Sequence, residues 1–281
     1  MDGESTFVLP RYIIEMESTA TFQLLSTLVR EPTASVTDVL EQFSHLTSAA
    51  RSPSNEETPF GALPYNTCCA LLEIAKRTAP QAQHKLVSFV TELQKVKLYD
   101  QRDGGQMSSE GYLLWTELPA LGYTAADEWN AFDVTTASTP SEETRRYENM
   151  IALLAQLSTA ADVDYAETTV PELDFTFWSL RAFKEAFDQQ DSTDAAVRTA
   201  CMWLIYGSKR LWANIQYGRV FGRRDGEPGV VLTKEMWDSW VEGLRRVKEH
   251  CQRPETHDIV DEALASMGRL SAQPFTNGSS N

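Results

Sequence analysis

Apolar side chains recur at helical spacing along most of this chain. On a helix, residues three and four positions apart share a face, at about 100° per residue. Residues 173–189 place five large apolar side chains on one such face: Leu173, Phe177, Leu180, Phe183 and Phe187. Phe175, Trp178 and Ala182 fall almost opposite. A helix that is apolar on two faces is buried between other helices, so this spacing predicts a fold built from packed helices.

The composition supports the same fold class. The chain has 281 residues, of which 42% are hydrophobic and only 14 are glycine. This is enough apolar material for a sizeable core, and the scarcity of glycine argues against an all-β fold. We therefore predict an all-α, single globular multi-helix bundle of roughly ten helices with a Trp-rich central layer. The single α-helical domain is expected over 1–272, with irregular linkers near 51–64, 100–110 and 134–144, and 273–281 is expected to be a disordered tail.

Capping residues and helix breakers locate several of the expected elements. Residues 11–29 are predicted to form one helix, because their apolar side chains follow a single stripe that ends before Pro32. Ser35, Thr124 and Thr233 precede helical stretches and are predicted N-caps, since their hydroxyls can accept hydrogen bonds from free backbone N–H groups. The short run PGVVLT is the best strand candidate in the sequence.

The charge balance limits the partners that we expect. The formal net charge is −15. Binding to nucleic acid or to an anionic membrane surface needs clustered cations, so neither is expected. The N-terminal stretch MDGESTFVLPRY lacks the features of a secretory signal, and no run approaches the roughly 20 apolar residues that span a bilayer. Adjacent Cys68 and Cys69 are a poor basis for a disulfide framework, so we expect a reduced, cytoplasmic protein.

The stretch CMWLIYGSKRLWANIQYGR concentrates large rings in residues 201–219. Placed on one helix over 195–217, its apolar side chains form a broad stripe that faces a core. The opposite face aligns rings with a guanidinium: Thr199, Trp203, Tyr206, Arg210 and Tyr217. Two interpretations fit this face. It is either a second packing layer whose polar tips reach the surface, or the wall of an apolar pocket in which Arg210 holds a carboxylate.

Three arginines follow in the loop GRVFGRRDGEPG: Arg219, Arg223 and Arg224. They cluster in a chain that is otherwise acidic. One interpretation is a solvated loop whose cations pair with nearby carboxylates. The other is a glycine-hinged flap that attracts an anionic substrate.

Motifs of several enzyme classes are absent from the sequence. It has no G-x-S-x-G elbow, no G-x-x-x-x-G-K-[ST] phosphate loop and no G-x-G-x-x-G dinucleotide motif. EHCQRPETHD gathers four residues of metal-ligating types in a spacing that matches no standard zinc site: His250, Cys251, His257 and Asp258. A magnesium-dependent terpene cyclase needs its carboxylates inside a helix. DQQDSTD instead places its carboxylates at a helix end: Asp188, Asp191 and Asp194. We therefore expect neither a metal nor an organic cofactor.

Five segments occur in an order that resembles a known family: LLWTELPALGYTAADEWN, RRYENMIALLAQL, FTFWSLRAFKEAFD, TACMWLIYGSKRLW and LTKEMWDSWVEGLRRVKE. The series is similar to the filamentous-fungal family described as domain of unknown function 3632, over most of the chain from Phe22 to Leu270. The resemblance implies a helical, single-domain fungal protein. Members often lie near genes of specialised metabolism, which implies a biosynthetic role. The family has no defined catalytic motif to transfer, so the candidate site residues rest on helical geometry.

The first functional hypothesis is a cofactor-independent cyclase or isomerase, for example a pericyclase-type enzyme of fungal specialised metabolism. It would fold a hydrophobic, polyketide- or terpenoid-like substrate against aromatic rings. Arg210 and Tyr206 are the candidate catalytic residues, because a guanidinium stabilises developing negative charge and a hydroxyl can relay a proton. The candidate substrate-binding residues are Trp178, Arg181, Trp203, Tyr217 and Trp237.

The second hypothesis is a non-catalytic intracellular helical scaffold or regulator that binds a protein partner. Its basis is the missing catalytic signature. An enclosed cavity lined by Trp203 and Arg210 would favour the enzyme, and a solid core beside an exposed apolar patch would favour the scaffold. The sequence leaves the oligomeric state open, and a homodimer is among the states that we consider.

Overall fold

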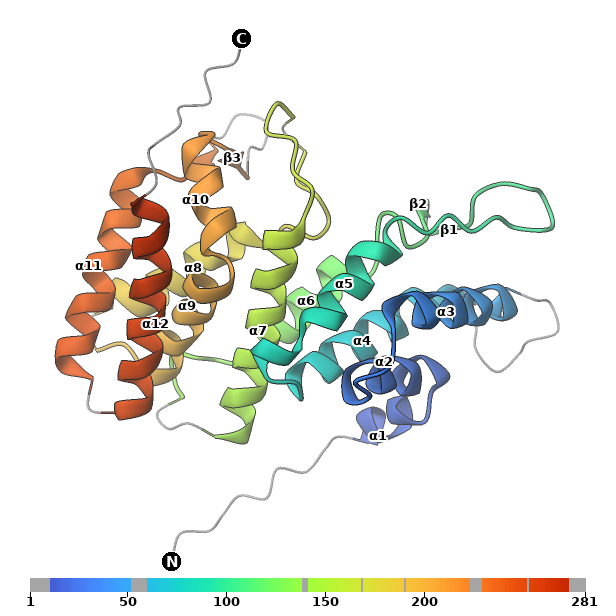
Figure 1. Cartoon of the computed structure of the whole chain (residues 1–281), viewed down its shortest axis with the longest axis horizontal. Helices are drawn as coiled ribbons and strands as arrows, with labels where there is room; N and C mark the ends of the chain where they lie inside the picture. The colour runs from blue at the N-terminus through green and yellow to red at the C-terminus, as the bar shows by residue number, and fades with distance from the viewer. Residues whose placement is uncertain are drawn as a thin grey trace, which may run out of the picture. The chain divides into compact units, whose positions relative to one another are not determined.

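The computed structural model of the chain consists mainly of α-helices (Figure 1). It describes residues 11–51, 60–137, 141–167, 169–189, 191–222, 229–251 and 253–272. Within these ranges there are twelve α-helices, two short 3₁₀ helices and two pairs of two-residue strands. The predicted all-α fold class is confirmed. The tail predicted over 273–281 lies outside the described residues.

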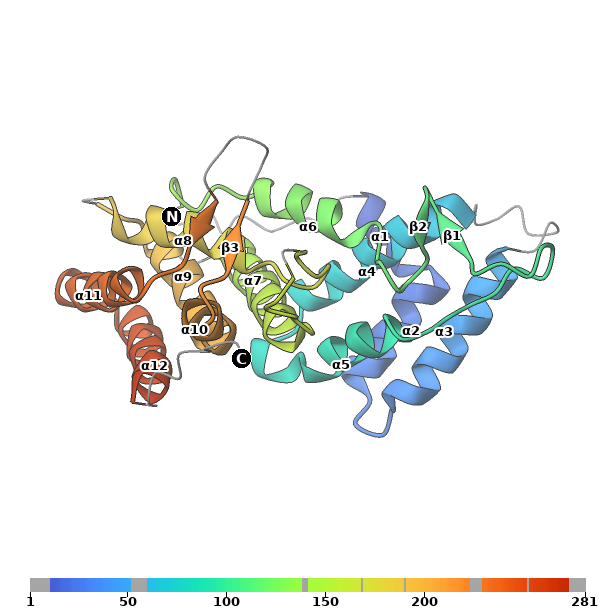
Figure 2. The same ribbon diagram turned by 90° about the horizontal axis from the view of Figure 1, so that it is seen from above.

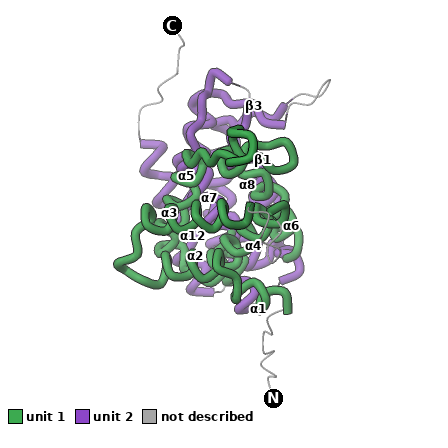
Figure 3. The backbone as a smooth tube through the Cα atoms, turned by 90° about the vertical axis from the view of Figure 1, so that its right-hand side faces the viewer, with its two compact units in different colours: residues 1–132, 145–150 green, residues 133–144, 151–281 purple. Residues whose placement is uncertain are grey.

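The chain divides into two compact units, which are coloured separately in Figure 3. Unit 1 comprises residues 1–132 and 145–150, and unit 2 comprises residues 133–144 and 151–281. Helix α7 (Glu142–Ala160) contributes residues to both units. The single domain expected over 1–272 stays a prediction, and the number of unfolding transitions tests it.

Unit 1 is built around α2, which packs against α3, α4 and α5. Its elements are α1 (Arg11–Glu17), α2 (Ala20–Arg30), α3 (Val36–Ala50), η1 (Phe60–Ala62), α4 (Leu63–Lys76), η2 (Pro80–Ala82), α5 (His84–Leu93), β1 (Ser108–Ser109), β2 (Tyr112–Leu113) and α6 (Leu121–Asn130). Strands β1 and β2 pair antiparallel. Leucine and phenylalanine side chains fill the core, where the buried rings of Phe43 and Phe89 meet edge to face with centroids 5.5 Å apart.

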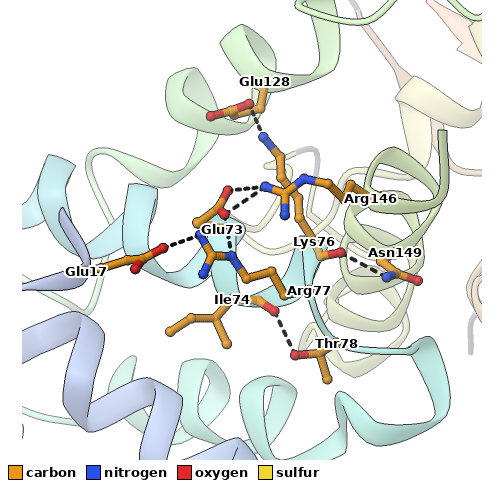
Figure 4. Close-up of polar contacts among 9 residues, drawn as sticks. All are labelled: Glu17, Glu73, Ile74, Lys76, Arg77, Thr78, Glu128, Arg146 and Asn149. Carbon is orange, nitrogen blue, oxygen red and sulfur yellow. Dashed lines mark hydrogen bonds and ion pairs between the residues drawn. The ribbon is translucent and has the colours of Figure 1, made fainter. Parts of the chain in front are cut away.

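A buried ion-pair network joins α4 to the part of α7 that belongs to unit 1 (Figure 4). Both carboxylate oxygens of buried Glu73 accept hydrogen bonds from Nη2 of Arg146, at 2.7 and 2.6 Å. Arg77 donates through Nε to Glu73 at 2.6 Å, and through Nη2 to Glu17 at 2.6 Å. A buried carboxylate gives up its hydrogen bonds to water, which costs free energy unless other groups replace them. The two arginines replace them and so allow Glu73 to be buried.

Unit 2 is built around α9 (Asp194–Tyr206), which packs against both α8 and α12. Its other elements are α8 (Thr176–Phe187), α10 (Ser208–Gln216), β3 (Val220–Phe221), β4 (Val230–Val231), α11 (Lys234–His250) and α12 (Pro254–Ser271). Helices α11 and α12 run side by side in Figure 1 and Figure 2. Strands β3 and β4 pair antiparallel, so the strand predicted in PGVVLT is confirmed as β4.

Tryptophans form much of the core of unit 2. Trp203, Trp212, Trp237 and Trp240 are all buried. The ring centroids of Trp212 and Trp237 lie 5.0 Å apart, and those of Trp237 and Trp240 lie 6.3 Å apart. These clusters agree with the predicted Trp-rich layer, and they place it inside unit 2.

Two helices that the sequence predicts as continuous are interrupted, and the first of them lies over 11–29. The structure instead has α1 and α2, separated at Ser18 and Thr19. Thr19 has an extended backbone (φ −74°, ψ 145°), and its Oγ1 accepts a hydrogen bond from the N–H of Phe22 at 3.3 Å. An N-cap within an apolar stripe therefore starts a new helix without altering the stripe's spacing.

The single helix predicted over 195–217 is also wrong. Helix α9 ends at Tyr206 and α10 begins at Ser208. At Gly207 between them, a Cβ atom would lie 2.8 Å from the carbonyl oxygen of Trp203, so a larger residue would collide with the backbone of α9. The break puts Arg210 on a different helix from Trp203 and Tyr206, which divides the predicted aromatic face.

The N-caps predicted at Ser35 and Thr233 are confirmed, whereas Thr124, which the sequence also predicts to cap a helix, lies inside α6. Oγ of Ser35 accepts a hydrogen bond from the N–H of Asp38 at 3.1 Å. Oγ1 of Thr233 accepts one from the N–H of Met236 at 3.3 Å. Each cap involves residues only three positions apart, which is why the sequence alone located it.

Candidate functional site

A cleft of about 830 Å³ lies in unit 2 where four helices begin or end. The C-terminal end of α8, the loop after it and the start of α9 form one wall, and the end of α11 and the start of α12 form the other. Apolar side chains lie among the polar ones on both walls: Phe187, Val197 and Val247. The cleft suits a ligand that has both charged and apolar parts.

Carboxylates line the first wall. Asp188 and Asp191 are exposed in the loop that follows α8. Helix α9 then begins after Thr193, whose Oγ1 accepts a hydrogen bond from the N–H of Ala196 at 3.1 Å. Asp194 occupies the first position of α9, where the positive end of the helix dipole favours a carboxylate.

Asp194 connects the two walls. Its Oδ1 accepts a hydrogen bond from Oγ1 of Thr256 and lies 3.9 Å from Sγ of Cys251. Nε of Arg253 lies 4.0 Å from the other carboxylate oxygen. Cys251 is a free, half-buried thiol at the end of α11. The carboxylate therefore holds the end of α11 and the start of α12 against α9.

The second wall presents cations and an imidazole. Arg246 and His250 are exposed in the last two turns of α11, and Arg253 is half-buried before α12. Nδ1 of His250 lies 2.8 Å from the carbonyl oxygen of Arg246. A carbonyl oxygen only accepts hydrogen bonds, so Nδ1 carries the proton of the neutral ring and Nε2 is its basic atom. Arg246 also donates through Nη2 to the carbonyl oxygen of Phe187.

A close helix contact sets the separation of α11 from α8. A Cβ atom at Gly243 would lie 2.7 Å from Cγ and 2.9 Å from Cδ1 of Phe187. Glycine at this position therefore lets α11 approach the last turn of α8, and Arg246 is one turn further along α11.

The arrangement can recognise charge and move a proton. The first wall attracts a cationic or donor group, and the arginines of the second attract a carboxylate or an enolate oxygen. Nε2 of His250 and the carboxylates can each accept a proton. Among the described residues, no three His, Cys, Asp or Glu side chains converge as they do around a metal ion.

The sequence-predicted aromatic residues do not line this cleft. Trp203 and Trp237 are fully buried, and Nε1 of Trp237 donates to Oγ of Ser271 at 3.0 Å. Trp178 is half-buried on α8, with its ring 5.1 Å from that of Phe175. These rings pack within unit 2, and the substrate-binding roles predicted for them stay predictions.

Arg210 is engaged with the end of α7. It donates through Nε to the carbonyl oxygen of Ser158 at 2.8 Å, through Nη2 to that of Ala161, and through Nη1 to the hydroxyl of Tyr165 at 2.9 Å. The ring of Tyr165 stacks on the exposed ring of Tyr217, with centroids 4.2 Å apart. Arg210 therefore supplies donors to carbonyl groups that the end of a helix leaves without partners.

Tyr206 and Arg181 have other contacts. Burial, with a smaller contribution from Glu262, raises the pKa of Tyr206 to about 12. Thr159 donates to the backbone oxygen of Tyr206 at 2.8 Å. Arg181 is exposed, and its Nε donates to Glu185 at 2.8 Å. The catalytic roles of Arg210 and Tyr206 stay predictions.

The predicted arginine flap is only partly described. Arg223 and Arg224 lie outside the described residues. Arg219 is buried and paired with Asp174, so it belongs neither to a solvated loop nor to an exposed flap.

The cleft joins two sequence clusters, each of which by itself suggests only a candidate metal site. Asp188, Asp191 and Asp194 come from DQQDSTD, and His250 and Cys251 come from EHCQRPETHD. More than fifty positions separate the two in the sequence, and no local pattern shows that they meet. The one available signal was that both clusters occur at helix ends.

Comparison with known proteins places the chain in a family. The model of a family described as "protein of unknown function (DUF3632)" matches residues 69–244. The chain belongs to this family. The DUF3632 match includes the acidic wall of the cleft and ends at Leu244, before the second wall. No curated protein and no solved structure matches the chain.

In the described part of the chain, no helix combines the length and the apolar character that crossing a bilayer requires.

Proposed function

We propose that this DUF3632 protein is a cofactor-independent cyclase or isomerase of specialised metabolism, and that its substrate binds in the cleft of unit 2. The observation that carries the proposal is the opposition of carboxylates on one wall to two arginines and an imidazole on the other. Acid–base catalysis needs groups of this kind within reach of one bound molecule. The same cleft has apolar lining that can bind a carbon skeleton.

The lining favours a particular substrate class. Arg246 and Arg253 suit a carboxylate or a carbonyl oxygen, while Phe187, Val197 and Val247 suit an alkyl or polyene chain. A terpenoid hydrocarbon would leave the charged groups without partners. We therefore favour a small, enolisable, polyketide-like carboxylic acid.

His250 is the proposed proton carrier. Its Nε2 accepts a proton from the carbon next to the substrate carbonyl, and the C–H electron pair moves onto the carbonyl oxygen as an enolate. The arginines of the same wall stabilise that oxygen. The imidazolium then returns the proton to the far carbon of a conjugated enolate, which moves a double bond. The proton that is removed is the proton that is returned, so no other reactant is required.

The test uses β,γ-unsaturated ketones that also carry a carboxylic acid group, with the purified protein in D₂O. Chromatography separates the conjugated isomer, and mass spectrometry measures deuterium in it. We expect His250→Gln to lower turnover at least ~100-fold, because general acid–base groups contribute about 10²–10⁴ in rate. His84→Gln, outside the cleft, is the matched histidine control and should keep wild-type turnover. Loss of turnover in Tyr206→Phe with full activity in His250→Gln would move the site back to the aromatic residues. If no acid is converted, the proposal fails.

A second candidate function, a helical scaffold that binds a protein partner, is favoured by a tyrosine patch in unit 1. Tyr12, Tyr65 and Tyr123 expose 60%, 45% and 46% of their surfaces. The rings of Tyr65 and Tyr123 stack with centroids 6.1 Å apart, and Cys69 is close enough to all three hydroxyls to affect their pKa values. Exposed tyrosines are enriched where proteins bind one another.

The scaffold function is tested by affinity capture combined with quantitative mass spectrometry. A partner that binds wild type and is lost from both Tyr65→Ala and Tyr123→Ala would support it. Phe177→Ala removes an exposed ring of unit 2 and is the control that should keep the partner. Sedimentation of wild type and Tyr65→Ala tests in parallel whether a homodimer uses this patch.

A further inference from the structure

A second polar cluster lies in unit 2, within a buried region that shares no residue with the cleft. The side chains of Asp174 and Arg219 are 0% and 5% exposed, and Nη1 of Arg219 donates to Oδ2 of Asp174. The N–H of Thr176, at 2.9 Å, and its hydroxyl donate to Oδ1. Both oxygens of the carboxylate therefore already accept hydrogen bonds.

Two donors in this cluster have no acceptor. Nη2 of Arg219 and Nδ2 of Asn214 are sealed from solvent, and neither finds an acceptor among the residues that the structure describes. Oδ1 of Asn214 lies 3.5 Å from Nη1 of Arg219, so the amide oxygen faces the guanidinium and the NH₂ group is the other arm of the same amide. Turning the amide round would set donor against donor. A buried donor without an acceptor costs about 1–3 kcal/mol, so two neighbouring ones indicate a missing acceptor.

The charges around the cluster indicate the nature of that acceptor. Arg210 is near, because Ser158 accepts a hydrogen bond from Nε of Arg210 at its carbonyl oxygen and another from the N–H of Phe175, the neighbour of Asp174, at its hydroxyl. Arg210 donates to neutral partners, two carbonyl oxygens and the Tyr165 hydroxyl. Among the described residues, this region therefore holds two guanidiniums and one buried carboxylate, and the guanidinium paired with Asp174 is that of Arg219. Asp162, Asp164 and Glu167 on the neighbouring loop are exposed, where solvent screens them.

We propose that this cluster binds one small monovalent anion, held by Nη2 of Arg219 and Nδ2 of Asn214. A water molecule would accept the same hydrogen bonds and leave the excess positive charge in place, whereas an anion neutralises it. The enclosure of both donors limits the ligand to the size of a halide, nitrate or formate ion. The ion would stabilise unit 2 where α8, α10 and the chain before β3 meet.

Bromide is the probe, because its anomalous scattering distinguishes it from water. Crystals of the full chain soaked in sodium bromide should show an anomalous peak within hydrogen-bonding distance of both donors. In solution, the thermal midpoint should rise saturably with bromide relative to sodium gluconate at equal ionic strength, by about 3–6 °C at tenfold excess over Kd.

Variants at Asn214 identify the donors. Asn214→Leu should lose the peak and the bromide-dependent rise, while Gln216→Leu, half-buried on the same helix, should keep both. Asn214→Asp supplies a negative charge from the chain itself, so its midpoint should no longer respond to bromide. Circular dichroism checks the fold of each variant.

Several results would overturn the proposal. Electron density beside the two donors that gives no anomalous signal would show that water is the acceptor. Equal midpoints in bromide and gluconate would show that no anion stabilises the protein. A peak that persists in Asn214→Leu would be an adventitious ion only. If Asn214→Leu does not fold, the wild-type crystal and Asn214→Asp still decide the question.

Discussion

The contact between α11 and α8 allows a quantitative test of the packing that positions the cleft. A Cβ atom at Gly243 would lie 2.7, 2.9 and 3.0 Å from Cγ, Cδ1 and Cβ of Phe187. Carbon atoms in good contact are about 3.5–4.0 Å apart. Gly243→Ala therefore requires α11 to move away from α8 by roughly 1 Å, or Phe187 to leave its position against Phe183.

Two opposing effects set the size of the change. In a helix interior, alanine is favoured over glycine by about 1 kcal/mol. Overpacking a core site costs about 1–3 kcal/mol, and the atoms met at Phe187 are the base of its side chain, which cannot swing aside. Gly268 on α12 has nothing within 4 Å of its Cβ position, so Gly268→Ala has the same gain without the clash. Gly243→Ala should therefore be the less stable of the two by about 1–3 kcal/mol.

Urea unfolding followed by circular dichroism measures this difference. The two alanine variants are compared with wild type, and each is then combined with Phe187→Ala. This change removes Cγ and Cδ1 of residue 187, so it should cost less stability in Gly243→Ala than in Gly268→Ala, because only the first is coupled to residue 187. Equal stability of the two alanine variants, or equal effects of Phe187→Ala in both, would refute the reasoning.

Three further predictions concern other parts of the molecule. Glu73→Leu removes the buried acceptor that Arg146 and Arg77 share and should lower the free energy of unfolding by about 3–5 kcal/mol. Glu17→Gln, at the more exposed end of the network, should lower it by less than about 1 kcal/mol. Urea titrations compare the two variants, and equal losses would contradict the assignment. Burial raises the pKa of Tyr206 from 10.0 to about 12, so the unfolded chain loses this proton first and stability should fall as pH rises through this range. Tyr206→Phe should lessen the fall in the urea midpoint between about pH 9 and about pH 11. An unchanged fall would count against the burial of this hydroxyl. Burial also raises the pKa of the Cys68 thiol, so a maleimide should label half-buried Cys69 and Cys251 well before Cys68 in the native protein. Peptide mass spectrometry measures the labelling, and equally fast labelling of Cys68 would contradict its burial.

The candidate site was less predictable from sequence than the helices were. One continuous helix would align Arg210 with the nearby aromatic rings, which is why the sequence predicts a site there. The break at Gly207 removes that alignment. The residues that do share a cleft, such as Asp191 and His250, lie on segments far apart in the chain. Their separate clusters were visible, but their meeting depends on how α8, α9, α11 and α12 pack.

The amino-acid sequence by itself determined the helical fold class, the N-caps at Ser35 and Thr233, and the strand at Val230 and Val231. These features arise from hydrogen bonds and apolar spacing among residues a few positions apart, so they can be predicted locally. Only the tertiary structure decided that α9 stops at Gly207, that Arg210 binds the end of α7, and that two distant polar clusters form one cleft. Each depends on side chains brought together by packing, and the spacing of residues within one segment carries no information about that.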